Sequence, residues 1–145
     1  MKLKIETSAG GIVYKIKNDE VHWLIVKHSI YNKWIFPKGL IGDKVEQESA
    51  KAAAIREVEE EGGVKAKIVN ENPFVVNYTY KFGEFLVKKT VYYYLMKYIS
   101  GDAKDHDHEV SDATFEEEKD VKKFLSFESD KNAFEEMLHK QKHNS

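Results

Sequence analysis

Short runs of hydrophobic residues alternate with polar turns along most of this chain, and their spacing predicts more strand than helix. Six runs have the alternation, β-branched content or aromatic content that suits a pleated sheet. They cover residues 11–17, 21–27, 64–69, 74–80, 85–98 and 110–115. Polar or glycine-containing turns separate them at residues 17–20 and 82–84. The chain is therefore expected to build a sheet from segments that are spread over most of its length.

Three segments have the composition or periodicity of helices instead. They cover residues 49–62, 119–125 and 130–140. In the last one, Phe134, Met137 and Leu138 form one apolar stripe, and the first one ends at a Gly-Gly pair that is typical of a helix stop. Residues 28–47 show little periodicity and are expected to form a long loop, of a length that is usually functional or disordered. The order of the elements predicts a mixed β-sheet flanked by helices, of the α+β or α/β class.

Length, charge and composition exclude several classes of protein. The chain has 145 residues, which suits one domain spanning 1–145 rather than two. Its 23 basic and 25 acidic residues give a net charge of -2, which argues against a general nucleic-acid-binding protein. The absence of cysteine excludes disulfide frameworks, zinc-thiolate sites and thiol catalysis. No apolar run approaches the length of a membrane helix, and residues 1–4 do not begin a signal peptide, so we expect a cytoplasmic protein with no membrane partner.

The most informative segment is the first predicted helix, which ends in a cluster of glutamates. At about 100° per residue, Glu57, Glu60 and Glu61 share one sector of the helix, whereas Glu59 points to the opposite side. Three like charges one turn apart repel one another, and the helix dipole disfavours anions at this end. A sequence that accepts both penalties is expected to provide a compensating cation. Mg²⁺, which is bound by carboxylates together with substrate phosphates, suits such a set of oxygen ligands.

A solvated acidic helix face is the simpler interpretation of a glutamate-rich run. Two features favour a metal site over it. The same side of the helix carries alanine at positions 50, 53 and 54, so another backbone segment can approach it closely. The second feature is a long spacing pattern, which consists of Gly42, five residues, Glu48, seven residues and then the segment REVEEEGGV.

This pattern matches, at every fixed position, the Nudix box G-x5-E-x7-R-E-U-x-E-E-x-G-U, in which U is apolar. The chain therefore resembles the Nudix hydrolase family. The similarity extends to SAGGIV at residues 8–13, which looks like the first core strand of the family, and to WIFPKG at residues 34–39, which looks like its W-x-x-P-K-G segment. The resemblance implies the Nudix fold, a mixed sheet between helices in an α/β/α sandwich, over nearly the whole chain.

One departure from the family pattern lies just before the helix. In most members the glycine of Pro-Lys-Gly is also the box glycine, but here Gly39 precedes Glu48 by three residues too many and Gly42 takes the formal position. We interpret residues 40–47 as a loop with a three-residue insertion. The backbone carbonyl that faces the metal is then that of Lys38, Gly39 or Gly42.

The resemblance implies a hydrolase that uses Mg²⁺, with Mn²⁺ as a substitute, to cleave a phosphoanhydride bond in a nucleoside diphosphate linked to a group X. Water attacks one phosphorus atom, and the demands on the protein are positioning and charge neutralisation. The implied metal ligands are Glu57, Glu60 and Glu61, together with a backbone carbonyl such as that of Lys38.

Three further residues receive roles by the same resemblance. Glu48 and Arg56 look like the internal pair of the box, in which the arginine fixes the loop and a glutamate in place; an ordinary surface ion pair is the alternative. Glu109 lies in the acidic segment HDHEV, where many family members place an extra acid as a ligand or base. The general base would be Glu57 or such an acid from a later loop.

Within the family, the chain is most similar to bacterial diadenosine tetraphosphate hydrolases, because KTVYYYL looks like their K-T-V-x-Y-x-L strand. Lys38 and Lys89 would then neutralise a polyphosphate. Tyr78 or Tyr80 would stack on a base, although packing within the sheet is the more ordinary role for either tyrosine alone. The expected partner is a small nucleotide.

Several alternatives stay open at this point. The family also cleaves nucleoside triphosphates, the 5′ ends of RNA and ADP-ribose, and the sequence does not choose among these reactions. A Nudix domain that senses a nucleotide without cutting it is a further alternative. Such domains usually lack a box carboxylate, whereas Glu57, Glu60 and Glu61 are all present here.

Overall fold

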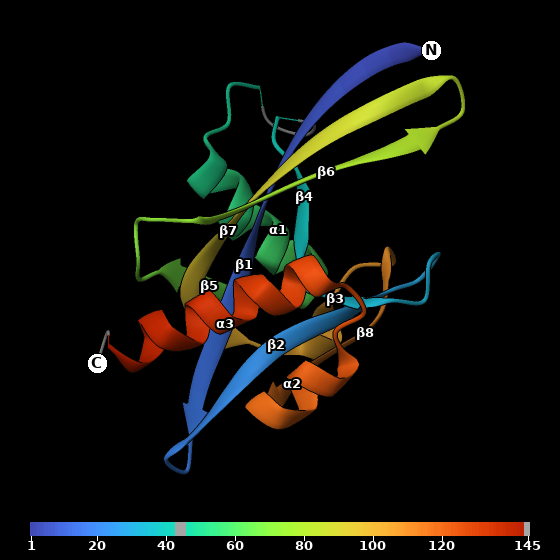
Figure 1. Cartoon of the computed structure of the whole chain (residues 1–145). Helices are drawn as coiled ribbons and strands as arrows, with labels where there is room; N and C mark the ends of the chain where they lie inside the picture. Colours follow the sequence, from blue (N-terminus) through green and yellow to red (C-terminus); the bar gives the residue numbers. More distant parts are fainter. Residues whose placement is uncertain (43–45, 144–145) are drawn as a thin grey trace.

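The computed structural model describes residues 1–42 and 46–143, and these residues form an eight-stranded mixed sheet with helices packed against it (Figure 1). The strands are β1 (Lys2–Lys17), β2 (Glu20–His28), β3 (Trp34–Ile35), β4 (Lys38–Leu40), β5 (Val64–Ile68), β6 (Phe74–Phe82), β7 (Phe85–Gly101) and β8 (Val110–Glu117). The helices are α1 (Ala50–Gly62), α2 (Glu118–Phe124) and α3 (Glu128–Lys142), and the 3₁₀ turn η1 spans Ala103–Asp105. The strand order is β3-β2-β1-β7-β5, with β4 beside β1, β6 beside β7 and β8 beside β2.

The helices cover two faces of the sheet, because neighbouring residues of β1 belong to separate apolar clusters. Ile12 packs in one cluster with Phe134 of α3, and Val13 packs in the other with Val58 of α1. In Figure 1, α1 lies behind the sheet and α3 crosses in front of it. β1 and β7 are parallel, whereas the other strand pairs are antiparallel. The prediction of a mixed sheet between helices, the α/β/α sandwich, is confirmed.

The first predicted helix is present and is capped at both ends. The Ser49 hydroxyl oxygen accepts a hydrogen bond from the Ala52 backbone N–H at 3.1 Å. At the other end, Gly63 has a left-handed φ of 73° and donates its N–H to the Glu59 carbonyl at 3.0 Å. These caps explain why the Ser-to-Gly boundaries in the sequence predicted α1 to within a residue.

The predicted loop over residues 28–47 is partly wrong, because it contains β3 and β4. Each of these strands has two or three residues, too few to show a period-two pattern. The strands form because their backbones complete the edges of β2 and β1. Residues 43–45, which fall within the interpreted insertion, lie outside the described residues.

β1 begins at Lys2, nine residues before the predicted start of the first strand. The segment KLKIE alternates polar and apolar residues, so a strand signal was present, and residues 2–5 are all exposed, with Leu3 57% and Ile5 72% accessible. It pairs with β7, and β7 pairs with β6, so that the three strands extend together as a long ribbon (Figure 1). The ribbon matters for function because part of it forms one side of a cleft.

Candidate active site

A cleft of about 610 Å³ opens where β4, α1 and the ribbon meet. Its described lining combines acidic, basic and aromatic side chains. They are His28, Tyr31, Lys33, Ile35, Lys38, Gly39, Leu40, Glu57, Glu61, Tyr78, Tyr80, Lys89, Glu109 and Phe127. Seven of the ten side chains that were singled out from the sequence therefore lie together, and Glu48, Arg56 and Glu60 lie outside this lining.

β4 brings the Pro-Lys-Gly segment against the glutamates of α1. The Lys38 backbone N–H donates to the Glu61 carboxylate at 3.1 Å. Gly39 lies so close to Glu57 that a β-carbon at this position would overlap the Glu57 carboxylate. The glycine is thus required by the close approach of a backbone to an acidic side chain.

Glu57 and Glu61 are each only 5% exposed, although no lysine or arginine side chain forms an ion pair with Glu61 among the described contacts. Burial raises the pKa of Glu57 to about 8, assisted by its hydrogen bond with Glu60 and by the charge of Glu61. Burial also raises the pKa of Glu61 to about 8, and the charges of Asp107 and Glu109 act in the same direction. Two buried acids with raised pKa values form a site in which negative charge is disfavoured, although Arg56 compensates part of it at Glu57.

This donor set fits a hard divalent cation such as Mg²⁺. Carboxylate oxygens are its preferred protein ligands, and a bound cation would favour the ionised form of both acids, which burial and neighbouring negative charges disfavour. Glu60, whose side chain is 28% exposed, lies beside the pair and contacts Arg56 at 3.0 Å. Glu57, Glu60 and Glu61 could therefore hold the ion. Glu60 would then replace part of its contact with Arg56 by a contact with the metal.

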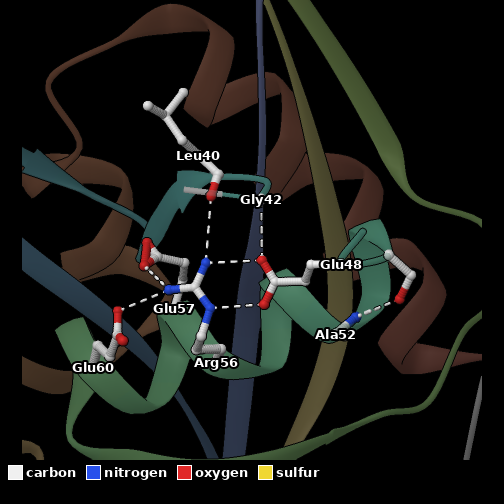
Figure 2. A network of polar contacts seen from close by, with 8 residues as sticks. Leu40, Gly42, Glu48, Ala52, Arg56, Glu57 and Glu60 are labelled. Atoms are coloured by element: carbon white, nitrogen blue, oxygen red, sulfur yellow. Dashed lines mark hydrogen bonds and ion pairs between the residues drawn. The ribbon is translucent and has the colours of Figure 1, made fainter. Parts of the chain in front are cut away.

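Arg56 connects α1 to the segment that precedes it (Figure 2). Its Nε and Nη2 atoms donate to the two carboxylate oxygens of Glu48 at 2.7 and 3.0 Å, a bidentate pair. Its Nη2 atom also donates to the Leu40 carbonyl at 3.3 Å, and Glu48 accepts from the Gly42 N–H at 3.2 Å. The guanidinium holds the pKa of Glu48 below its ordinary value, mainly through the hydrogen bond.

The same guanidinium reaches the acidic site. Its Nη1 atom donates to Glu57 at 2.9 Å and to Glu60 at 3.0 Å (Figure 2). Arg56 therefore orients two candidate metal ligands while Glu48 orients Arg56. Of the three candidate carbonyl-bearing residues, Lys38 and Gly39 line the cleft, whereas Gly42 lines a separate hollow beside β1.

The lining of the cleft also includes basic and aromatic side chains. The Lys38 ammonium lies 3.5 Å from the Tyr78 hydroxyl and 5.7 Å from the centre of the Tyr78 ring. The rings of Tyr78 and Tyr80 lie 6.1 Å apart and remain about 37–38% exposed. Lys89 is half-buried, and burial together with the nearby charge of Lys38 lowers its pKa.

The loop before β8 contributes Glu109. Its carbonyl accepts from the Ser29 N–H at 3.0 Å and from the Ser29 hydroxyl at 2.8 Å, and its own N–H donates to Asp107 at 3.1 Å. These contacts hold the loop against the end of β2, so that Glu109 reaches the cleft and its charge acts on Glu61.

Several residues of the site were missed in the sequence. Asp107, two residues before Glu109, acts more strongly on the pKa of Glu61 than Glu109 does. His28, Tyr31 and Phe127 line the cleft, with the His28 and Tyr31 rings 4.8 Å apart. Tyr31 lies beside the W-x-x-P-K-G segment, and this nearness could have marked it as a residue of the site. Nothing in the local pattern of residues around Phe127 points to a cleft.

Among the described residues, the ligand atoms of Glu20, His22 and Glu117 lie within 4.8 Å of one another, a closeness that the set of Glu57, Glu60 and Glu61 does not reach in this structure. None of Glu20, His22 and Glu117 lines the cleft. The register of the sheet pairs Lys15 with His22 and Lys17 with Glu20.

The α/β/α sandwich and the helix whose glutamates contact Arg56 define a class of proteins. Comparison with known proteins identifies the family. The model of the NUDIX domain matches residues 6–137. The chain belongs to the Nudix family.

Individual relatives agree with this assignment. MutT4 of Mycobacterium tuberculosis is 32% identical in an alignment over 123 residues that covers 79% of this chain and 47% of that protein, so the chain spans about half the length of this relative. A Caenorhabditis elegans Ap4A hydrolase in a binary complex superposes with a TM-score of 0.74 at 24% identity, covering 92% of this chain and 98% of the other.

The NUDIX domain of Shewanella oneidensis NrtR in complex with ADP ribose superposes with a TM-score of 0.68 at 17% identity, covering 97% and 90% of the two chains. At these identities the two structural likenesses establish the fold alone. The described residues contain no helix with the length and apolarity needed to span a membrane.

Proposed function

We propose that this protein is a Mg²⁺-dependent hydrolase that cleaves a phosphoanhydride bond in a nucleoside diphosphate linked to X, most suitably a dinucleoside polyphosphate such as diadenosine tetraphosphate. The observation that carries the proposal is the composition of the cleft. Two buried carboxylates, Glu57 and Glu61, and two lysines, Lys38 and Lys89, line the same cleft. A polyphosphate bound there would meet both lysines and, once the acids hold a metal, a cation as well.

Glu57, Glu60 and Glu61, with the carbonyl of Lys38 or Gly39, would hold the Mg²⁺, or Mn²⁺ in its place. When bound, the ion would neutralise phosphate charge and lower the pKa of water, which is the chemistry that the cleft otherwise lacks.

The side chains of the protein would supply the remaining steps. Lys38 and Lys89 would bind the phosphate oxygens and keep the chain of phosphates extended along the cleft. Arg56, held by Glu48, would keep Glu57 in one orientation through their 2.9 Å contact. Glu57 or Glu109 would accept the proton of the attacking water, because both carboxylates line the cleft.

The choice of a dinucleoside polyphosphate rests on the aromatic side chains. Tyr78 and Tyr80 form an exposed aromatic surface next to both lysines, and Tyr31 and Phe127 form another part of the lining. Aromatic rings stack on any base, so a substrate with a base at each end would use more of this lining than a substrate with one. The fold shared with the C. elegans Ap4A hydrolase is compatible with this substrate class.

A substrate panel tests the proposal. Diadenosine tetraphosphate, nucleoside triphosphates, ADP-ribose and 5′-triphosphorylated RNA would each be incubated with the protein and Mg²⁺, and the nucleotide products would be separated by chromatography. We expect the fastest turnover with diadenosine tetraphosphate, and complete loss with EDTA or in the Glu61→Gln variant.

Faster turnover of ADP-ribose or a nucleoside triphosphate would reject the proposed substrate class but keep the proposed reaction, the hydrolysis of a phosphoanhydride bond. Binding of nucleotides without any Mg²⁺-dependent cleavage would instead favour a sensor domain and reject the proposed hydrolase.

A further inference from the structure

Glu6 lies on β1 beside basic and aromatic side chains that line the cleft. It is paired in register with Lys89 of β7, and Lys89 is paired with Tyr78 of β6, so the three residues form one row across the ribbon. Tyr80 lies in the next row on the same face. Glu6 itself lines the neighbouring hollow beside Leu40, whereas the other three side chains line the cleft.

The Glu6 carboxylate contacts groups from three strands. Its Oε1 atom accepts a hydrogen bond from the Tyr80 hydroxyl at 2.9 Å and lies 3.9 Å from the Lys89 ammonium. Its Oε2 atom lies 3.7 Å from the ammonium of Lys4. The Glu6 and Lys89 side chains are each only 15% exposed, so this contact is shielded from water more than most surface ion pairs are.

Two of the three contacts of Glu6, those with Tyr80 and Lys89, involve side chains that line the cleft. The hydrogen bond fixes the ring of Tyr80, which is otherwise free to turn about its side-chain bonds on an exposed strand. The carboxylate also opposes the two influences, burial and the charge of Lys38, that disfavour the charged form of Lys89. The other charged or titratable groups around Glu6 and its two partners are Lys4 on β1, Tyr78 on β6 and Glu61 on α1.

We propose that Glu6 is a positioning residue of the substrate site, which holds the Tyr80 ring and the Lys89 ammonium in the orientation that binds the nucleotide. This inference rests on the proposed function. Glu6 does not line the cleft, so its effect is carried by the two side chains that it contacts.

A positioning role predicts a specific kinetic pattern. Removal of Glu6 weakens the binding of substrate and transition state equally, because Glu6 acts through Tyr80 and Lys89, which are assigned neither to the metal nor to proton transfer. The KM therefore rises while kcat stays nearly constant. A residue that merely braces the ribbon would lower the melting temperature and leave KM unchanged in the folded fraction.

The test compares Glu6→Ala, Glu6→Gln and Tyr80→Phe with the wild type, and Glu84→Gln serves as the matched control. Glu84 lies in the turn of the same ribbon, and its exposed side chain pairs with Lys2 at 3.2 Å. We expect Glu6→Ala to raise the KM about three- to tenfold, the factor that one net hydrogen bond supplies, with kcat within about twofold. Glu6→Gln keeps an acceptor for Tyr80 and gives a smaller increase, and Glu84→Gln has the kinetics of the wild type.

A double-mutant cycle tests whether the residues act together. The effects of Glu6→Ala and Tyr80→Phe on KM should be less than multiplicative when combined, because the second change removes a contact that is already lost. Strictly multiplicative effects would contradict a role through Tyr80.

A binding measurement separates this proposal from the proposed reaction. Inorganic tripolyphosphate is titrated calorimetrically into the wild type and Glu6→Ala in EDTA, at a temperature well below both melting points. Weaker binding by Glu6→Ala supports the role of Glu6 even if the substrate panel shows no hydrolysis. Equal or tighter binding by Glu6→Ala together with an unchanged KM overturns the role assigned to Glu6, and if the wild type does not bind tripolyphosphate without metal, an unchanged KM alone overturns it.

Discussion

At the scale of single residues, the site depends on acids that are buried before any metal binds. Glu57 and Glu61 are among four buried polar or charged residues of the described chain, and both have a pKa near 8. The box motif predicted that these glutamates gather on one side of α1, but it could not predict their burial. Burial depends on β4, which brings the backbone of Lys38 and Gly39 against them.

The raised pKa of Glu61 predicts that the metal-free protein loses stability as the pH rises. Below the ordinary value of 4.5, Glu61 is protonated in both the folded and the unfolded states. Between 4.5 and about 8, the unfolded chain releases this proton while the folded protein retains it, so the free energy of unfolding falls by up to about 1.4 kcal/mol per pH unit for this group. Glu57 acts in the same direction.

Glu61→Gln stays neutral at every pH and should therefore be more stable than the wild type at pH 8 in EDTA, by an amount on the order of a few kcal/mol. Urea denaturation at several pH values measures this difference. Glu59→Gln, an exposed position of the same helix, should follow the wild type. Parallel stability curves for Glu61→Gln and the wild type would show that Glu61 is ionised normally in the fold.

At the scale of the elements, α1 was the most predictable part of the molecule, because its boundaries and its chemistry are both local. The Ser49 and Gly63 caps and the spacing of the box are properties of one continuous segment. β3 and β4 could not be predicted, since they exist only as partners of β2 and β1. The connection between β4 and α1 is made by Arg56, whose contacts span both elements (Figure 2).

Arg56→Lys tests this connection. A lysine keeps the charge but cannot bind Glu48 through two parallel hydrogen bonds and Glu57 at the same time. We expect kcat on the best substrate of the panel to fall about 10- to 100-fold with a small change in KM, because the orientation of Glu57 is lost. Steady-state kinetics measure both parameters.

Lys122→Gln provides the control for a general loss of ion pairs. It removes exposed contacts to Glu118 and Glu135 at 3.3 and 2.9 Å, which should contribute about 1 kcal/mol or less. Normal kcat in Arg56→Lys would show that the network orients nothing that matters to the reaction.

At the scale of the whole molecule, the cleft joins residues that are far apart in the chain. Lys38, Glu61, Lys89 and Phe127 meet because the sheet order brings β4, α1 and β7 together. The resemblance to the family predicted the first three of these residues. Phe127 was missed because its position depends on how α3 packs, and a single sequence contains no signal for that packing.

Metal binding should therefore stabilise the whole fold, and more so at higher pH. The ligands must lose their protons before they bind a cation, so Mg²⁺ binds weakly well below the pKa of about 8 and tightly above it. We expect millimolar Mg²⁺ to raise the melting temperature by several degrees at pH 8.5 and by much less at pH 6. Differential scanning fluorimetry measures this shift.

Glu61→Gln should show a much smaller shift with Mg²⁺ at either pH, since it lacks one buried ligand. The cluster of Glu20, His22 and Glu117 supplies a second control, and His22→Gln should respond to Mg²⁺ as the wild type does. A full response in Glu61→Gln would place the binding site elsewhere.

The parallel pairing of β1 with β7 also determines when β1 can find its partner strand during synthesis of the chain. Lys2 pairs with Phe85 and Tyr14 with Lys97, so this pairing of β1 must wait until the much later β7 has been synthesised. Until then, residues 2–7 of β1 lack the strand that they pair with in the fold, and open strand edges bearing Leu3 and Ile5 are an aggregation hazard. A translational pause within β6 would prolong that exposure, so codon choice in this stretch should influence the yield of soluble protein.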